Sequence, residues 1–198
     1  MSKLFLLRHL ESQWNKENRF TGWTDVPLSD EGVEAAKEAA KNFVGIKIDK
    51  IYTSPLARNK ETVSLILKNL EEIEPPIIAD KALDERNYGE LQGLNKDEVI
   101  KKYGEEKVHL WRRSYNVAPP GGESLEDVCK RAVPFFKKYV EKDLKDGKNV
   151  LVVASHNSLR AIVKYVENIS DEKIIDLELP FGALIKYEFD SGEYIKYN

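Results

Sequence analysis

The chain has 198 residues, a net charge of −3 and a hydrophobic fraction of 41%. We predict a single domain over residues 1–198, because no Pro-, Gly- or Ser-rich linker divides a chain of this length. The slight acidic excess argues against a nucleic-acid partner, and no apolar run is long enough to span a membrane. No secretory signal precedes the first apolar run, so we expect a cytoplasmic location.

The first predicted element is a buried strand, the apolar run at residues 4–7, which ends at Arg8 and His9. Such runs are typical of strands covered on both faces in α/β proteins, where ligands bind beyond the carboxyl ends of the strands. A second run, residues 150–154, leads in the same way to His156. Because the chain has only three histidines, two of them at strand ends indicate function rather than packing.

Helical and strand patterns alternate along the rest of the chain. The first half has a helix from the N-cap Ser29, a strand at 50–53, a helix at 57–70, and an irregular segment at 75–123 with one or two short helices. The second half has a helix from Ser124 towards Lys145 that is bent at Pro134, the strand at 150–154, and a helix at 158–167. A short helix from Ser170 and a hairpin of 183–189 and 194–197 follow. This alternation predicts an α/β fold with a mainly parallel sheet flanked by helices in three layers. The single cysteine, Cys129, is expected to be a buried small residue.

The residues at the strand ends suit phosphoryl transfer. That chemistry needs cations around the phosphate oxygens, a nucleophile in line with phosphorus, and an acid for the leaving oxygen. Arg8 and Arg58 offer planar guanidinium groups, and His9 offers a nucleophilic nitrogen. His156 can donate a further hydrogen bond. Glu85 is the candidate acid, although spacing alone does not select it among the acidic residues.

Longer motifs carry a resemblance to a known family. RHLESQWN at residues 8–15 and RFTGWTD at residues 19–25 resemble the signature of the cofactor-dependent phosphoglycerate mutases of the histidine phosphatase superfamily. Further matches lie at residues 85–96, 111–113 and 157–160, so the similarity extends over most of the chain. On this resemblance the three-layer α/β fold is expected to be phosphoglycerate mutase-like, in a short variant of the family.

The resemblance implies interconversion of 3-phosphoglycerate and 2-phosphoglycerate through a phosphohistidine at His9, primed by 2,3-bisphosphoglycerate and without a metal. It makes Glu85 the general acid and base and places Arg8, Arg58 and His156 around the phosphoryl group. The carboxylate and second phosphate of this small phosphorylated acid would be held by Asn15, Thr21, Gly22, Arg58, Tyr88, Lys96, Arg112, Arg113 and Asn157. Extra cations suit a ligand with several negative charges. The resemblance makes a homodimer possible but does not establish one.

Three features depart from the family pattern. Leu10 replaces the Gly that follows the nucleophilic His, and its side chain either crowds the phosphate or points into the core. No Gly separates His156 from Asn157, which implies a shorter turn into the following helix. The chain also lacks a loop that longer mutases insert near residues 119–124, and it stops soon after its last strand.

These departures leave three hypotheses. The substrate-side matches favour the mutase. The short chain resembles the smaller phosphatase branch, where fewer covering segments admit water and transfer becomes hydrolysis. A histidine phosphatase acting on a small phosphomonoester is therefore the main alternative, and a non-catalytic binding protein of the same fold is the third. The products separate them, because a mutase yields an isomer and a phosphatase yields inorganic phosphate.

Overall fold

The computed structural model describes residues 1–70 and 74–197. These residues form a six-stranded sheet with the order β3-β2-β4-β1-β5-β6. The strands are β1 (Ser2–Arg8), β2 (Lys50–Thr53), β3 (Ile77–Ala79), β4 (Val150–Ala154), β5 (Leu184–Asp190) and β6 (Glu193–Tyr197). β3, β2, β4 and β1 pair in parallel, whereas β5 is antiparallel to both of its neighbours. The expected mainly parallel sheet is confirmed.

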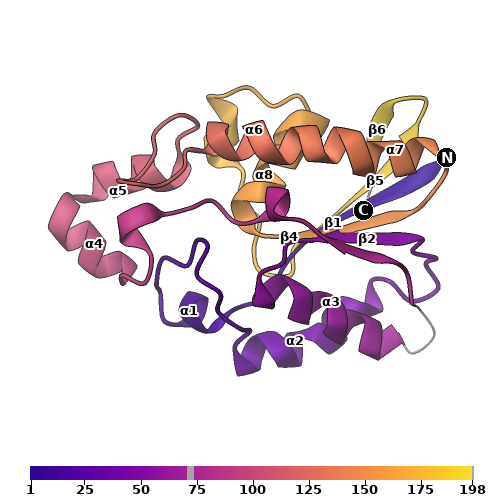
Figure 1. The fold of residues 1–198 in the computed structure, drawn as a ribbon, viewed down its shortest axis with the longest axis horizontal. Coiled ribbons are helices and arrows are strands. Elements are labelled where there is room, and N and C mark those ends of the chain that lie inside the picture. The colour runs from indigo at the N-terminus through magenta and orange to yellow at the C-terminus, as the bar shows by residue number, and fades with distance from the viewer. Residues whose placement is uncertain (71–73, 198) are drawn as a thin grey trace.

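Helices cover both faces of this sheet (Figure 1). The helices are α1 (Gln13–Lys16), α2 (Asp30–Lys41), α3 (Ala57–Leu70), α4 (Lys96–Tyr103), α5 (Glu105–Arg113), α6 (Leu125–Phe135), α7 (Glu141–Lys145) and α8 (His156–Val166). α6, α7 and α8 pack on one face, and α2 and α3 pack on the other. α4 and α5 lie apart from these layers, at the end of the molecule towards which β1 runs. This is the expected three-layer arrangement.

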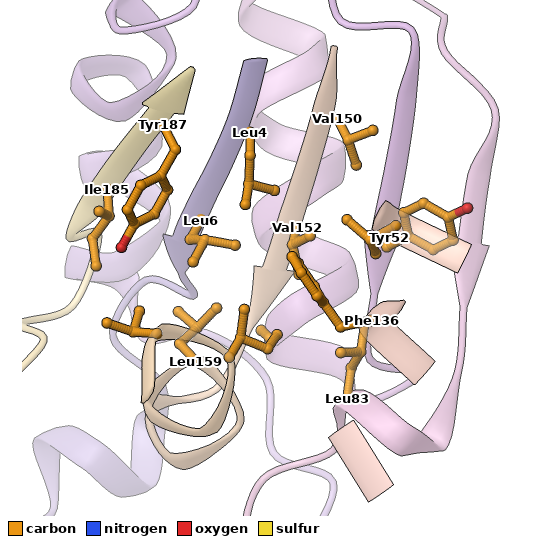
Figure 2. Close-up of a cluster of buried hydrophobic side chains, with 14 of the residues drawn as sticks. Leu4, Leu6, Tyr52, Leu83, Phe136, Val150, Val152, Leu159, Ile185 and Tyr187 are labelled. Atoms are coloured by element: carbon orange, nitrogen blue, oxygen red, sulfur yellow. The ribbon is translucent and has the colours of Figure 1, made fainter. Parts of the chain in front are cut away.

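The two central strands, β1 and β4, are covered on both sides because alternate residues point to opposite faces. Leu4 and Leu6 belong to one cluster with Leu159 of α8 and with Phe136 (Figure 2), and Phe5 and Leu7 pack against α2 and α3. All four side chains are at most 1% exposed. Burial of each such side chain contributes about 1.5–3 kcal/mol. The residues that follow β1 and β4 are therefore anchored by two strands that are buried on both faces.

Three details differ from the expected elements. The irregular segment contains the edge strand β3, whose three exposed residues show no apolar alternation. α8 begins at His156, two residues earlier than expected, because Ser155 has the extended backbone of an N-cap. After Pro134 the helix widens into a π-helical turn at Phe136–Val140 before α7, so the irregularity there is a change in helix type.

Two smaller observations complete the fold. Cys129 is half-buried, so the expectation of a buried residue holds only in part. Among the described residues no helix is both long enough and apolar enough to cross a membrane.

Candidate active site

A cavity of about 260 Å³ lies at the carboxyl ends of β1 and β4. Its lining residues are Arg8, His9, Asn15, Arg19, Phe20, Thr21, Gly22, Arg58, Glu85, Tyr88, Lys96, Arg112, Arg113, His156, Glu178 and Phe181. The structure thus brings together every site residue expected from the sequence except Asn157. Arg19, Phe20, Glu178 and Phe181 line the cavity without having been expected.

His9 is held as a neutral nucleophile. Its side chain is 2% exposed, and Nδ1 lies 2.6 Å from the carbonyl oxygen of Leu10. Since a carbonyl only accepts hydrogen bonds, Nδ1 carries the proton and Nε2 keeps its lone pair. Burial, together with the charges of Arg58 and Arg8, holds the pKa of His9 well below its usual value. The imidazole is therefore uncharged and nucleophilic at neutral pH.

Arg58 is fixed next to the loop after α1. Its guanidinium is buried and donates to the carbonyl oxygens of Gly22 at 2.7 Å and Thr24 at 3.1 Å. Gly22 has a φ of +56°, and a Cβ there would lie 2.1 Å from Oε1 of Gln92. The left-handed backbone favours glycine at this position, and any larger residue would also displace the Gln92 side chain. Burial lowers the pKa of Arg58, although the nearby charges of Glu85, Asp25 and Asp84 act in the opposite direction.

Arg8 is held from two sides. It donates to the carbonyl oxygen of Leu179, and its Cζ lies 3.9 Å from the centroid of the Phe181 ring. Burial lowers the pKa of Arg8 to about 10, so it stays charged at neutral pH. The buried guanidinium of Arg58 and the partly buried one of Arg8 lie beside His9 and form a site that an anion with several oxygens would complete.

Glu85 presents one carboxylate oxygen to the cavity. Oε1 accepts three hydrogen bonds, from the backbone N–H of Arg86 at 2.7 Å and from the backbone N–H and Nδ2 of Asn157 at 3.2 and 3.0 Å. Oε2 has no such partner among the described residues. Burial alone would raise the pKa of Glu85, but His156, these donors and Arg58 outweigh it, and the pKa is lowered. The Asn157 N–H belongs to the first turn of α8, where the helix dipole favours negative charge.

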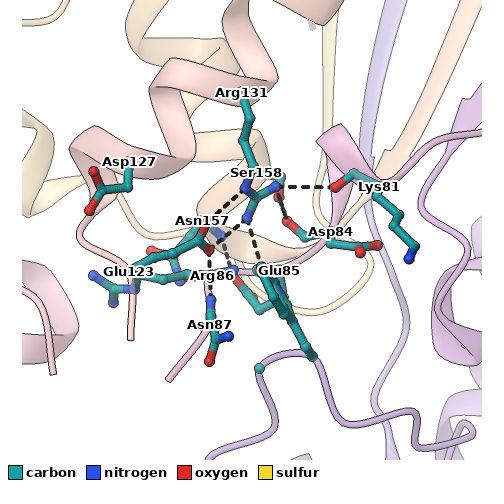
Figure 3. A network of polar contacts seen from close by, with 12 residues as sticks. Lys81, Asp84, Glu85, Arg86, Asn87, Glu123, Asp127, Arg131, Asn157 and Ser158 are labelled. Carbon is teal, nitrogen blue, oxygen red and sulfur yellow. Dashed lines mark hydrogen bonds and ion pairs between the residues drawn. The ribbon is translucent and has the colours of Figure 1, made fainter. Parts of the chain in front are cut away.

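The backbone that carries Glu85 is clamped by Arg131 of α6 (Figure 3). The Arg131 guanidinium donates to the carbonyl oxygens of residues 82, 84 and 85 at 2.8–2.9 Å. It also forms two 2.9 Å bonds to the carboxylate of Glu123. The indole of Trp23 donates to the same Glu85 carbonyl oxygen at 2.7 Å. Sequence reasoning missed Arg131, because an arginine in an amphipathic helix resembles a solvated surface residue.

Asn157 is not among the residues that line the cavity, and its contacts favour a role other than the substrate binding that the resemblance implied. It is 1% exposed, its amide nitrogen binds Glu85, and its Oδ1 accepts from Arg160 at 3.1 Å. With no Gly between them, His156 and Asn157 are consecutive residues in the first turn of α8. Asn157 is therefore a residue that positions Glu85.

His156 is also uncharged at neutral pH. Its Nε2 lies 3.4 Å from the backbone nitrogen of Leu179 and 3.4 Å from Oε2 of Glu178, so it accepts from Leu179 when it carries no proton and donates to Glu178 when it carries one. Burial lowers the pKa of His156 to about 4, assisted by Arg8, although Glu178 acts in the opposite direction. A phosphoryl group bound nearby would favour protonation, since its negative charge opposes the effect of Arg8.

A second set of cations lines the cavity from α4 and α5. Lys96 is the first residue of α4, and Arg112 and Arg113 end α5. Burial and the neighbouring Arg112 lower the pKa of Lys96 to about 8. The hydroxyl of Thr21 is buried and has no hydrogen-bonding partner among the described residues. These groups suit an anionic ligand.

Leu10 points away from the cavity. It is 3% exposed and packs with Leu28 and Ala36, and its backbone N–H donates to Oγ1 of Thr62 at 3.1 Å. Of the two outcomes left open by the sequence, the structure therefore shows the side chain in the core. Within residues 1–70 and 74–197, no cluster of His, Cys, Asp or Glu suited to a metal ion is found.

Comparisons with known proteins identify the family of the chain. The family model of the histidine phosphatase superfamily (branch 1) matches residues 4–196. A 2,3-bisphosphoglycerate-dependent phosphoglycerate mutase of Cytophaga hutchinsonii is 48% identical over 191 residues, which cover 96% of this chain and 89% of that protein. One of Treponema denticola is 45% identical over 217 residues, covering 96% and 88%. The solved structure of Bacillus stearothermophilus YhfR has a TM-score of 0.86 at 26% identity, covering 99% and 95%.

Proposed function

The chain belongs to the histidine phosphatase superfamily, and we propose that it is a mutase interconverting 3-phosphoglycerate and 2-phosphoglycerate, primed by 2,3-bisphosphoglycerate. One observation carries the proposal. The neutral His9 shares one cavity with two sets of cations, Arg8 and Arg58 beside it and Lys96, Arg112 and Arg113 on α4 and α5. A phosphomonoester needs only the first set, whereas a phosphoglycerate or bisphosphoglycerate supplies anions for both.

The reaction divides between His9 and Glu85. Arg8 and Arg58 bind the oxygens of the phosphoryl group while Nε2 of His9 takes it up. When a substrate hydroxyl attacks the phosphohistidine, an O–P bond forms, the N–P bond breaks, and Oε2 of Glu85 accepts the hydroxyl proton. In the reverse transfer Glu85 returns that proton to the leaving oxygen. The lowered pKa of Glu85 suits this cycle, because the base must be ionised before the hydroxyl attacks.

The second set of cations would hold the rest of the substrate. Lys96, Arg112 and Arg113 face the same cavity as the side chains of Asn15, Thr21 and Tyr88. A bound carboxylate or phosphate would raise the lowered pKa of Lys96 and give the Thr21 hydroxyl the partner that it lacks among the described residues. These residues therefore fit bisphosphoglycerate as the primer, and the cycle as drawn uses no metal.

The lack of an inserted loop does not favour the phosphatase. The alignment with the Cytophaga mutase spans 191 residues and covers 96% of this chain, so the two proteins have nearly the same length there. The alignment with the Treponema mutase spans 217 residues, more than the 198 of this chain, so that relative has additional residues. Relatives with and without an insertion carry the same name.

Phosphorus NMR tests the proposal. The protein, treated with a chelator, is mixed with 3-phosphoglycerate and a trace of 2,3-bisphosphoglycerate, and 2-phosphoglycerate and free phosphate are followed together. Isomer that depends on the trace primer, with little phosphate, supports the mutase. Phosphate as the dominant product supports the phosphatase, and neither product supports a binding protein. His9→Ala is the control, since it removes the phosphoryl acceptor.

The other expectations from the sequence remain predictions. They are a single domain over residues 1–198, a cytoplasmic location, a site without metal, no nucleic-acid or membrane partner, and the homodimer that the family admits.

A further inference from the structure

The cavity contains a carboxylate that the mechanism does not use. Glu178 lies in the segment between α8 and β5, and with Glu85 it is one of two acidic residues among the described lining residues. A carboxylate in a cavity suited to anions opposes the ligand, both by repulsion and by occupying a cation. The function proposed above therefore gives no reason for its presence.

Glu178 forms an ion pair with one cation of the cavity, Arg113. Its Oε1 lies 2.5 Å from a terminal nitrogen of Arg113, and its Oε2 lies 3.4 Å from Nε2 of His156. Hydrogen bonding to His156 and the charge of Arg113 lower the pKa of Glu178 to about 2, so the carboxylate is ionised at neutral pH. Lys96 and Arg112 form no ion pair with a described carboxylate, so Arg113 differs from its two neighbours.

The ion pair between Glu178 and Arg113 can open without a change in the fold. The side chain of Glu178 is 55% exposed, whereas that of Arg113 is 20% exposed. The glutamate can therefore rotate into solvent and leave the guanidinium in the cavity. The pair itself is partly screened by water, so an incoming anion can compete with it.

We propose that Glu178 is a specificity-determining residue that occupies Arg113 in the free protein and must be displaced by a ligand with a second anionic group. This deepens the proposed function, and rests on it for the choice of 3-phosphoglycerate as the ligand. A phosphoglycerate needs Arg113 and loses affinity to this competition. Inorganic phosphate fits between Arg8, Arg58 and His9 and leaves the pair intact. Glu178 therefore lowers affinity for two-ended anions more than for phosphate alone.

Titration calorimetry of the unphosphorylated protein tests this inference without turnover. We expect Glu178→Gln to lower the Kd for 3-phosphoglycerate about tenfold, the effect of freeing one charge-assisted hydrogen-bonding partner. The Kd for inorganic phosphate should change by less than about twofold. The substitution removes competition for Arg113, which phosphate does not use, and changes the electrostatic potential between Arg8 and Arg58 only slightly. An unchanged or higher Kd for 3-phosphoglycerate would overturn the inference, as would equal tightening of both ligands.

Two further variants identify the partner. Glu172→Gln removes the same charge from an exposed side chain outside the cavity, and should leave both Kd values unchanged. In an Arg113→Gln background, Glu178→Gln should no longer tighten 3-phosphoglycerate, since the cation in competition is gone. A persistent tenfold gain there would show that Glu178 acts through another group and would overturn the proposal.

Failure of the proposed function gives a different result. If the wild-type protein binds phosphate but not 3-phosphoglycerate, the substrate assignment fails. Glu178→Gln then either acquires binding of 3-phosphoglycerate, which supports the role of Glu178, or does not, which overturns it. Circular dichroism of each variant checks that the fold is retained.

Discussion

The side chain of Leu10 lies in the space that a side chain at residue 182 would otherwise take. A Cβ built on Gly182 would be 3.1 Å from Cδ2 of Leu10, and Gly182 has a φ of +70°. The two residues belong to the segments that follow β1 and precede β5, next to His9 and Phe181. The glycine at residue 182 therefore suits both the positive φ at that position and the space that Leu10 needs next to it.

Leu10→Ala should reduce stability without changing catalysis. The leucine packs in a small cluster with Leu28 and Ala36, so we expect a loss of about 2 kcal/mol in the free energy of unfolding. Urea denaturation measures that loss, and the phosphorus NMR assay measures turnover. A large fall in kcat with unchanged stability would instead show that Leu10 shapes the phosphate site.

The pH dependence of the reaction should follow Glu85. Its pKa in the folded protein is lowered from 4.5, so the carboxylate stabilises the fold at pH values above its unfolded pKa, and this stabilisation is lost as the pH falls through the folded value. As the general base, the Glu85 carboxylate should stay ionised until the pH falls to this lowered pKa. We expect the acidic limb of kcat/KM to lie below the ordinary carboxyl value of about 4.5, and Glu85→Gln to lower kcat by about 10²- to 10⁴-fold. An unchanged kcat in Glu85→Gln would assign the proton transfer to another group.

Asn157→Ala should shift the acidic limb of kcat/KM to higher pH. The substitution removes the 3.0 Å side-chain bond to Glu85, which favours the ionised carboxylate. We expect the pKa of Glu85 to rise and the acidic limb of kcat/KM to move to higher pH, while the KM for 3-phosphoglycerate stays the same because Asn157 does not line the cavity. A raised KM with an unmoved limb would restore the substrate-binding role that the family resemblance implied.

Phe181→Ala should divert phosphoryl groups to water. The Phe181 ring lies on Arg8, and its centroid is 6.0 Å from that of His9, so it covers the nucleophile. Without the ring we expect the half-life of the phosphohistidine to shorten several-fold and the ratio of free phosphate to isomer to rise. Phe181→Leu keeps an apolar cover and should retain most of the protection. Equal half-lives for wild type and Phe181→Ala would mean that another group excludes water.

Local patterns were enough to predict the buried elements. β2, β4 and α3 have the bounds that the sequence indicated, because their apolar residues repeat within a few positions. β3 was missed because its three residues are exposed and its order comes from pairing with β2. Strand order and the antiparallel direction of β5 likewise depend on distant partners.

The site was predicted as a set of residues but not as a set of contacts. Motifs identified His9, Glu85 and the cations, whereas the direction of Asn157 depends on where α8 begins. Arg131 and Glu178 carry no motif, and their importance appears only when α6 and the segment before β5 come together with residues far away in the chain.

The position of β1 in the sheet has a consequence for biosynthesis. Its two neighbours are β4, which ends at Ala154, and β5, which ends at Asp190. A chain growing from its N-terminus therefore carries β1 without either partner until most of its residues have left the ribosome. During that time His9 has neither the carboxyl end of β4 beside it nor the cover of Phe181. The surroundings of His9 are therefore completed by segments that are synthesised late.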